Sequence, residues 1–138
     1  MKRLSCLFLL AMTATAQAAP FDITEAWFRS LPGKLPAGGY FTAQNNTSRD
    51  VSITGVSSDA CGMLMIHQSS NKGGMTGMNM VDSVKVPAGG MVRFAPGGYH
   101  LMCEQPKMRI GAKVPVLLHL SDGSTVAVGF QVRNAAGK

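Results

Sequence analysis

Methionine and histidine supply the residues of this sequence that are best suited to bind a metal. Ten methionines and three histidines occur among 138 residues. Thioether sulfur and neutral imidazole are the donors that soft Cu(I) prefers. A single methionine, by contrast, is more simply explained as a filler of gaps in a hydrophobic core. The spacing of the set therefore decides between the two interpretations. The methionines after residue 18 are Met63, Met65, Met75, Met78, Met80, Met91, Met102 and Met108.

Two histidines and two methionines stand out by their spacing. His67 is followed by ten residues and then Met78, and 21 further residues precede His100, which lies two positions before Met102. Residues two apart in a strand point to the same side, so His100 and Met102 should face the same way. Two imidazoles and two thioethers can surround one Cu(I) in a roughly tetrahedral arrangement. The pattern predicts a copper site made of these four side chains.

The segment between His67 and Met78 must bring these two residues together. It contains three glycines, which favours a loop over residues 69–77 that turns the chain back. Three other methionines of this region, Met65, Met75 and Met80, are expected to pack or to guide copper entry before acting as ligands. The third histidine, His119, is expected at an exposed strand position outside the site.

Two cysteines follow the N-terminal segment. Cys61 and Cys103 would close a loop worth about 4 kcal/mol if they formed a disulfide, and export favours such pairing. The alternative is that Cys103, next to Met102, is a thiolate ligand. Alternation along a strand argues against it, because neighbours point to opposite faces. The same alternation places Cys61 on the face of His67, so a disulfide requires a bulge or a strand that begins later. We prefer the disulfide.

The N-terminus has the layout of a secretory signal peptide. Lys2 and Arg3 precede an apolar run from Leu4 to Met12, and Ala16-Gln17-Ala18 fits a cleavage site. The run is too short to span a bilayer. Cys6 lies inside it and is poorly placed for lipidation. We therefore expect a signal peptide at 1–18, a periplasmic mature chain at 19–138, and no membrane span after cleavage.

The mature chain has the pattern of an all-β protein. Short alternating runs are separated by Gly, Pro and Asn turns, which predicts an antiparallel β-sandwich or small barrel in a single domain. The expected strands are Ile23–Phe28, Gly39–Gln44, Val51–Val56, Met63–His67, Met78–Val81, Ser83–Val86, Met91–Phe94, Tyr99–Cys103, Val114–Leu120 and Thr125–Val132.

The sequence offers little support for catalysis or nucleic-acid binding. It lacks a phosphate-binding glycine loop, a nucleophile elbow and a zinc-protease helix motif. The net charge is +6, but the basic residues are scattered and do not interleave with aromatics. We therefore do not expect an enzyme or a nucleic-acid partner. We expect the protein to be a monomer.

The spacing of His67, Met78, His100 and Met102 resembles the His-x10-Met-x21-His-x-Met signature of the PCuAC family of periplasmic copper chaperones. The resemblance extends over roughly residues 23–132. It is carried by Ala26-Trp27-Phe28-Arg29, Gly39-Tyr40-Phe41, Asn45-Asn46, Val86-Pro87-Ala88-Gly89-Gly90 and Pro96-Gly97-Gly98-Tyr99-His100-Leu101-Met102.

The resemblance implies a cupredoxin-like fold and a carrier that passes Cu(I) to an acceptor. The acceptor would be the copper subunit of cytochrome c oxidase or a Sco-type thiol protein, during assembly of the oxidase copper site. Copper storage or tolerance, and a β-sandwich interaction domain without metal, remain as alternatives. A blue-copper electron carrier fits poorly, because its last loop runs Cys, His, Met, whereas here His100 and Met102 precede Cys103. The C-terminus carries no His- and Met-rich tail for Cu(II).

Overall fold

The computed structural model describes residue 14 and residues 19–72 and 75–138. The predicted signal peptide at 1–18 therefore lies almost entirely outside the described residues. The described part of the chain contains ten strands and no helix. Within that part, no helix is long and apolar enough to cross a membrane.

All ten predicted strands are present, which confirms the all-β prediction, although their ends differ and β4 continues five residues beyond its predicted end at His67. The strands are β1 (Phe21–Arg29), β2 (Ala37–Asn45), β3 (Val51–Ser57), β4 (Met63–Lys72), β5 (Met75–Met80), β6 (Val84–Val86), β7 (Met91–Phe94), β8 (Tyr99–Glu104), β9 (Lys113–Leu120) and β10 (Thr125–Arg133).

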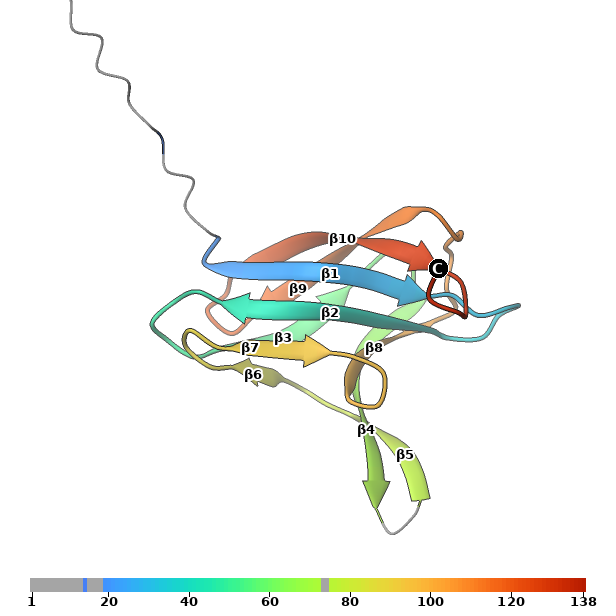
Figure 1. Ribbon diagram of the computed structural model, residues 1–138, viewed down its shortest axis with the longest axis horizontal. Coiled ribbons are helices and arrows are strands. Elements are labelled where there is room, and N and C mark those ends of the chain that lie inside the picture. The colour runs from blue at the N-terminus through green and yellow to red at the C-terminus, as the bar shows by residue number, and fades with distance from the viewer. Residues whose placement is uncertain (1–13, 15–18, 73–74) are drawn as a thin grey trace, which may run out of the picture.

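The strands form one curled sheet in the order β5-β4-β8-β2-β1-β10-β9-β3-β6, and β7 pairs with β2. Strand β2 changes partner along its length: Ala37–Gly39 pair with β8, and residues 41–44 pair with β7. This switch lets the sheet fold over itself into the two layers of a cupredoxin-like sandwich (Figure 1). All pairs are antiparallel except β1 with β10, which run parallel.

Aromatic side chains from both layers fill the core. Phe28, Phe41, Phe94 and Phe130 are almost fully buried. The rings of Phe41 and Phe94 lie 4.2 Å apart and nearly stacked, while those of Phe28 and Phe130 lie 5.0 Å apart. Burial of each such side chain contributes roughly 2–3 kcal/mol. This packing fixes β2, and β2 pairs with β8, which carries His100 and Met102.

A bulge in β1 decides which side chains of that strand reach the surface. The pairing of β1 with β2 shifts between Thr24 and Trp27. Since a bulge inserts one extra residue, it reverses the alternation of side chains along the strand. Phe21 and Phe28 consequently both point into the core although seven positions separate them. Trp27 and Arg29 are left on the opposite face.

The loop predicted over residues 69–77 is wrong. Strand β4 continues to Lys72 and β5 begins at Met75, so most of this segment is a β-hairpin. The pairing extends from His67 opposite Met80 to Lys72 opposite Met75. The hairpin extends beyond the body of the sandwich (Figure 1). Beyond Gln68, β4 no longer pairs with β8 and has only β5 as a partner, so this outer part of the hairpin does not cover the core and lacks the apolar alternation used to recognise the other strands.

Candidate metal centre

The four predicted ligands come from three neighbouring strands. His67 lies on β4, Met78 on β5, and His100 and Met102 on β8. His67 is directly opposite His100, and Met78 is directly opposite Ser69, two positions after His67. Directly opposed residues of an antiparallel pair share a face, as do residues two apart. All four side chains therefore project from the same side of the β5-β4-β8 segment.

The two histidines form the centre of this arrangement. Their ring centroids are 5.8 Å apart and the ring planes meet at 73°. His100 is only 6% exposed, and its Nδ1 lies 3.0 Å from the carbonyl oxygen of Gly98. Since a carbonyl only accepts, Nδ1 must carry the proton that it donates. The lone pair of His100 is then on Nε2, where a metal can bind it.

His67 is held in its neutral form by its surroundings. Burial lowers the pKa of His67, the neighbouring His100 lowers it further, and Glu104 acts in the opposite direction. Its Nδ1 is buried and has no hydrogen-bond partner among the described residues. A buried nitrogen without a partner costs about 1–3 kcal/mol. A neutral imidazole with an unpartnered nitrogen is suited to accept a metal ion.

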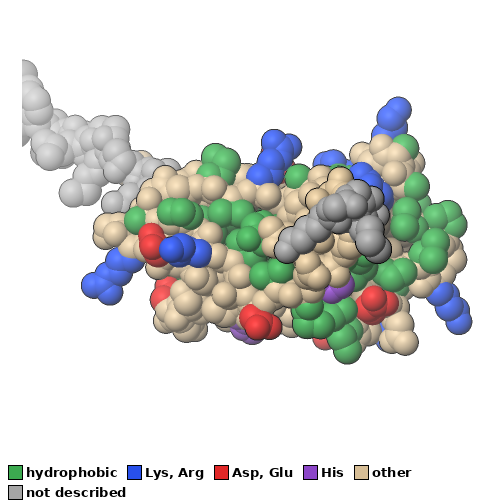
Figure 2. Space-filling view, turned by 90° about the horizontal axis from the view of Figure 1, so that it is seen from below, with side chains coloured by type: hydrophobic (Ala, Val, Ile, Leu, Met, Phe, Trp, Pro, Cys, Tyr) green, Lys and Arg blue, Asp and Glu red, His purple; other side chains and the backbone are tan. Residues whose placement is uncertain are grey.

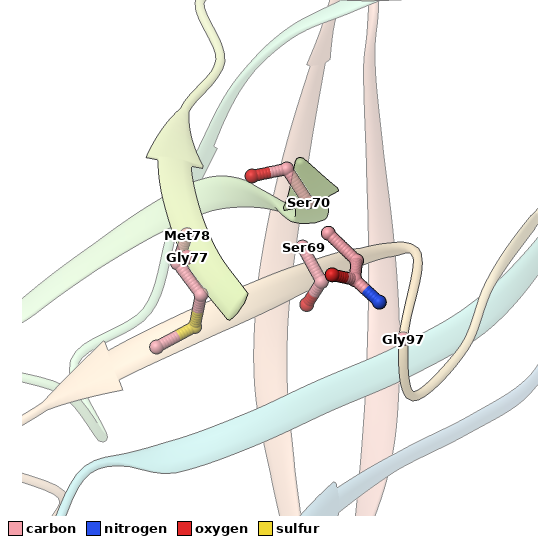
Figure 3. A pocket seen from close by; sticks show the side chains of 6 residues that line it. Ser69, Ser70, Gly77, Met78 and Gly97 are labelled. Atoms are coloured by element: carbon pink, nitrogen blue, oxygen red, sulfur yellow. The ribbon is translucent and has the colours of Figure 1, made fainter. Parts of the chain in front are cut away.

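The two thioethers lie at the rim of a hollow beside the histidines. The hollow has a volume of about 410 Å³, and its lining includes Met78, His100 and Met102. Met78 is 56% exposed, whereas Met102 is half-buried. Figure 3 shows the Met78 side chain beside Ser69, at a second hollow of about 340 Å³. Met78 is therefore the most accessible of the four side chains, His67 and Met102 are half-buried, and His100 is buried.

Glycine at position 38 keeps the hollow open. Gly38 pairs with Met102 across β2 and β8, so no side chain from β2 stands beside that thioether. A Cβ at Gly38 would lie 2.6 Å from the hydroxyl oxygen of Tyr40. That approach is too close, so a side chain here would force Tyr40 away. Tyr40 can lean over β2 only because position 38 lacks a side chain.

An aromatic and cationic group borders the hollow, and the sequence interpretation assigned it no role. The ring centroids of Trp27 and Tyr40 lie 4.9 Å apart, and the guanidinium carbon of Arg29 is 5.5 Å from each of them. Arg29 and Tyr40 line the hollow together with His100 and Met102. No carboxylate in the described part of the chain pairs with Arg29. The segments Ala26–Arg29 and Gly39–Phe41 did contribute to the family resemblance, but only the β1 bulge shows which of their side chains face the site.

Cys61 and Cys103 form a disulfide, with their Cα atoms 5.3 Å apart. Cys103 is fully buried on the core face of β8, opposite to the face of Met102. Strand β4 begins at Met63, so Cys61 lies in the turn before it. The alternation of side chains along the strand therefore does not determine where Cys61 points. The bond ties the start of β4 to the end of β8. Cys103 therefore has no thiolate to offer a metal.

The remaining side chains of interest lie elsewhere or play other parts. His119 is on β9, where its Nε2 is 3.3 Å from the hydroxyl of Ser57, and it does not approach the site. Met91 is exposed on β7, and Met108 packs against the core. The described residues contain no group of three or more His, Cys, Asp or Glu that could hold a metal. A metal site on the β5-β4-β8 face therefore depends on methionine sulfur.

The chain belongs to the LpqE-like family, whose model, described as "Putative lipoprotein LpqE-like", matches residues 21–132. A protein of Leifsonia xyli subsp. xyli named "Putative lipoprotein Lxx21020" is 31% identical over 130 residues, which cover 92% of this chain and 78% of that protein. An uncharacterized protein of Rickettsia prowazekii, RP573, is also 31% identical, with 84% of this chain and 68% of that protein covered.

Solved structures of PCuAC domains share the fold. The copper-bound PCuAC domain from PmoF2 has a TM-score of 0.71 at 22% identity, covering 88% of this chain and 99% of that domain. The solution structure of CuI-DR1885 from Deinococcus radiodurans has a TM-score of 0.69 at 28% identity, covering 89% and 85%. These matches confirm the resemblance to the PCuAC family that the sequence predicted.

Proposed function

We propose that this protein is an exported copper chaperone that holds one Cu(I) between His67, Met78, His100 and Met102. The observation that carries the proposal is the direct opposition of two imidazoles, with thioethers beside them, on one face of the β5-β4-β8 segment. Cu(I) favours this donor set. The copper-bound PmoF2 domain and CuI-DR1885 add support, since both have this fold.

The chemistry of the donors suits transfer. All four ligands are neutral, so they leave the charge of Cu(I) uncompensated and bind it less strongly than thiolates do. In an oxidising compartment thioethers cannot be lost to disulfides, although they can be oxidised to sulfoxides. The site should hold copper firmly enough to carry it and release it to an acceptor that offers thiolates.

The hollow beside the site is where we place the acceptor. Arg29 contributes a positive charge that no carboxylate of the described residues pairs with, and Leu31 and Leu35 contribute apolar surface. An acceptor thiolate is anionic, so Arg29 attracts it toward His100 and Met102. Hydrophobic side chains gather at the same end of the molecule, where the β1–β2 loop lies (Figure 2). A Sco-type thiol protein or the copper subunit of cytochrome c oxidase meets this description, which makes oxidase assembly the proposed use.

Export to the periplasm is part of the proposal. The predicted signal peptide at 1–18 supports it, as do the description of the family and the name of the Leifsonia xyli relative, both of which read putative lipoprotein. The Cys61–Cys103 disulfide adds support, because such bonds persist in oxidising compartments and are rare in the cytosol.

The test is a Cu(I) titration of residues 19–138 against a chromogenic chelator under anaerobic conditions. We expect one equivalent to bind, and Met102→Leu and His100→Gln to weaken binding at least about tenfold, or 1.4 kcal/mol. Met91→Leu is the control, because it makes the same Met-to-Leu change on β7, away from the proposed ligands. Equal effects of Met91→Leu and Met102→Leu would defeat the assignment.

A copper-transfer experiment with the same protein distinguishes delivery from storage and from a metal-free interaction domain. Loaded protein mixed with an oxidase copper domain or a Sco-type domain should lose its copper to that domain, as followed by metal analysis after separation. Copper that stays on the chaperone would favour storage or tolerance. Absence of any binding would leave a β-sandwich interaction domain.

A further inference from the structure

Three methionines that are not among the proposed ligands share the face of the site. Met80 is directly opposite His67, Met65 is directly opposite Met102, and Met63 is directly opposite Glu104. Directly opposed residues project to the same side, so these thioethers extend the donor face on the side away from the hollow. The register thus places Met80, His67 and His100 in one row across β5, β4 and β8.

Packing does not account for these side chains. Met80 is 65% exposed and Met63 is 58% exposed, although a methionine that fills a core gap would be covered. Met65 is half-buried. Met65 and Met80 are both neighbours of His67: one lies two positions before it, and the other lies directly across from it. As diagonal neighbours their Cβ atoms are about 7 Å apart, so their long side chains can meet over His67.

The charges on the two sides of the site differ. Glu104 follows Met102 by two positions on the same face, opposite Met63. Arg29 lies on the other side and lines the hollow with His100 and Met102. A cation is therefore attracted toward the side of Glu104 and repelled from the side of Arg29. Met65 is the diagonal neighbour of Glu104 across β4 and β8, whereas Met80 lies farther from it, opposite His67. Met65 is therefore the subsite sulfur closer to the attractive charge.

We propose that Met65 and Met80 form a second, weaker Cu(I) subsite through which copper reaches His67 and the main site. This inference rests on the proposed copper function. Two thioethers hold Cu(I) less firmly than two imidazoles with two thioethers, so copper moves onward from the subsite. Copper arrives on the Glu104 side, and the anionic acceptor approaches on the Arg29 side, so loading and delivery use different edges of the same site.

The subsite is tested by NMR of the mature protein with methyl-labelled methionines and Ag(I) as a probe that does not change oxidation state. The first equivalent should shift the methyl signals of Met78 and Met102. A second equivalent should shift those of Met65 and Met80, while the signal of Met91 stays in place. Unmoved signals of Met65 and Met80 through two equivalents would overturn the subsite.

A kinetic experiment tests its role in loading. The double variant Met65→Leu, Met80→Leu keeps all four proposed ligands, so its Cu(I) affinity at the main site should match that of the wild type. Stopped-flow loading from a Cu(I)–chelator complex should be about tenfold slower. Met91→Leu should load at the wild-type rate. Unchanged loading of the double variant would refute the route.

The two proposals fail in different ways. Shifts at Met65 and Met80 without shifts at Met78 and Met102 would reject the proposed main ligands and retain the thioether subsite. Shifts at Met78 and Met102 alone would retain the chaperone and reject the subsite.

Discussion

Removal of the disulfide should distinguish a structural role of Cys103 from a role in metal binding. Replacement of both cysteines by alanine opens a loop with a sequence separation of 42 residues. Chain entropy then predicts a loss of about 4 kcal/mol in the free energy of unfolding. For a domain of this size 1 kcal/mol corresponds to roughly 4 °C, so the melting temperature should fall by about 15 °C.

The Cu(I) affinity of the double alanine variant should change far less than its stability. His67 and His100 remain aligned by the β4–β8 pairing, and Cys103 points into the core, away from Met102. We expect the dissociation constant measured by chelator competition well below the melting temperature to change less than about threefold, or 0.7 kcal/mol.

Two comparisons make this prediction refutable. Wild-type protein treated with a reductant keeps both sulfur atoms, so a matching fall in its melting temperature assigns the loss to the bond and not to a cavity left by alanine. A fall of less than about 5 °C would show that the unfolded chain is already restricted and would refute the entropy argument. A loss of copper affinity equal to that of Met102→Leu would restore Cys103 as a ligand.

Three further outcomes follow from the structure. Gly39→Ala places a methyl group 2.9 Å from the Cβ of Leu101, so it should cost about 1–3 kcal/mol in chemical denaturation. Asn45→Ala removes a buried amide that donates to two backbone carbonyls and should cost about 2 kcal/mol in the same assay. The imidazole of His67 should titrate below its ordinary pKa of 6.5 by NMR, since burial and His100 lower it. Because the unfolded chain then binds this proton at higher pH than the folded chain, the stability of the copper-free protein should fall as the pH drops below about 6.5.

Strand positions and one pair of ligands could be predicted from the sequence because they depend on short-range alternation. Period-two patterns and turn residues located all ten strands, and the same alternation placed His100 and Met102 on one face. Alternation failed at the hairpin of β4 and β5. The outer part of that hairpin, beyond Gln68, has no buried side chain among those described, and three glycines there indicated a loop.

Longer-range features required the tertiary structure. The pairing of β4 with β8 sets His67 opposite His100, and no local pattern specifies which distant strands become partners. Alternation had placed Cys61 on the face of His67. Because β4 begins only at Met63, Cys61 lies in the turn before the strand and can bond to Cys103 on the other face. The bulge in β1 sends Arg29 to the hollow.

The sequence by itself therefore determined the types of donor atom, their order along the chain and the class of fold, since these follow from residue identity and local spacing. Alternation alone also places Met65 on the face of His67 and Met80 on the face of Met78. Only the tertiary structure decided that these strands lie side by side, so that Met65 and Met80 flank His67. It also decided that Glu104 and Arg29 both lie close to Met102, in different directions. Both depend on strand register, which is set by packing of the whole core.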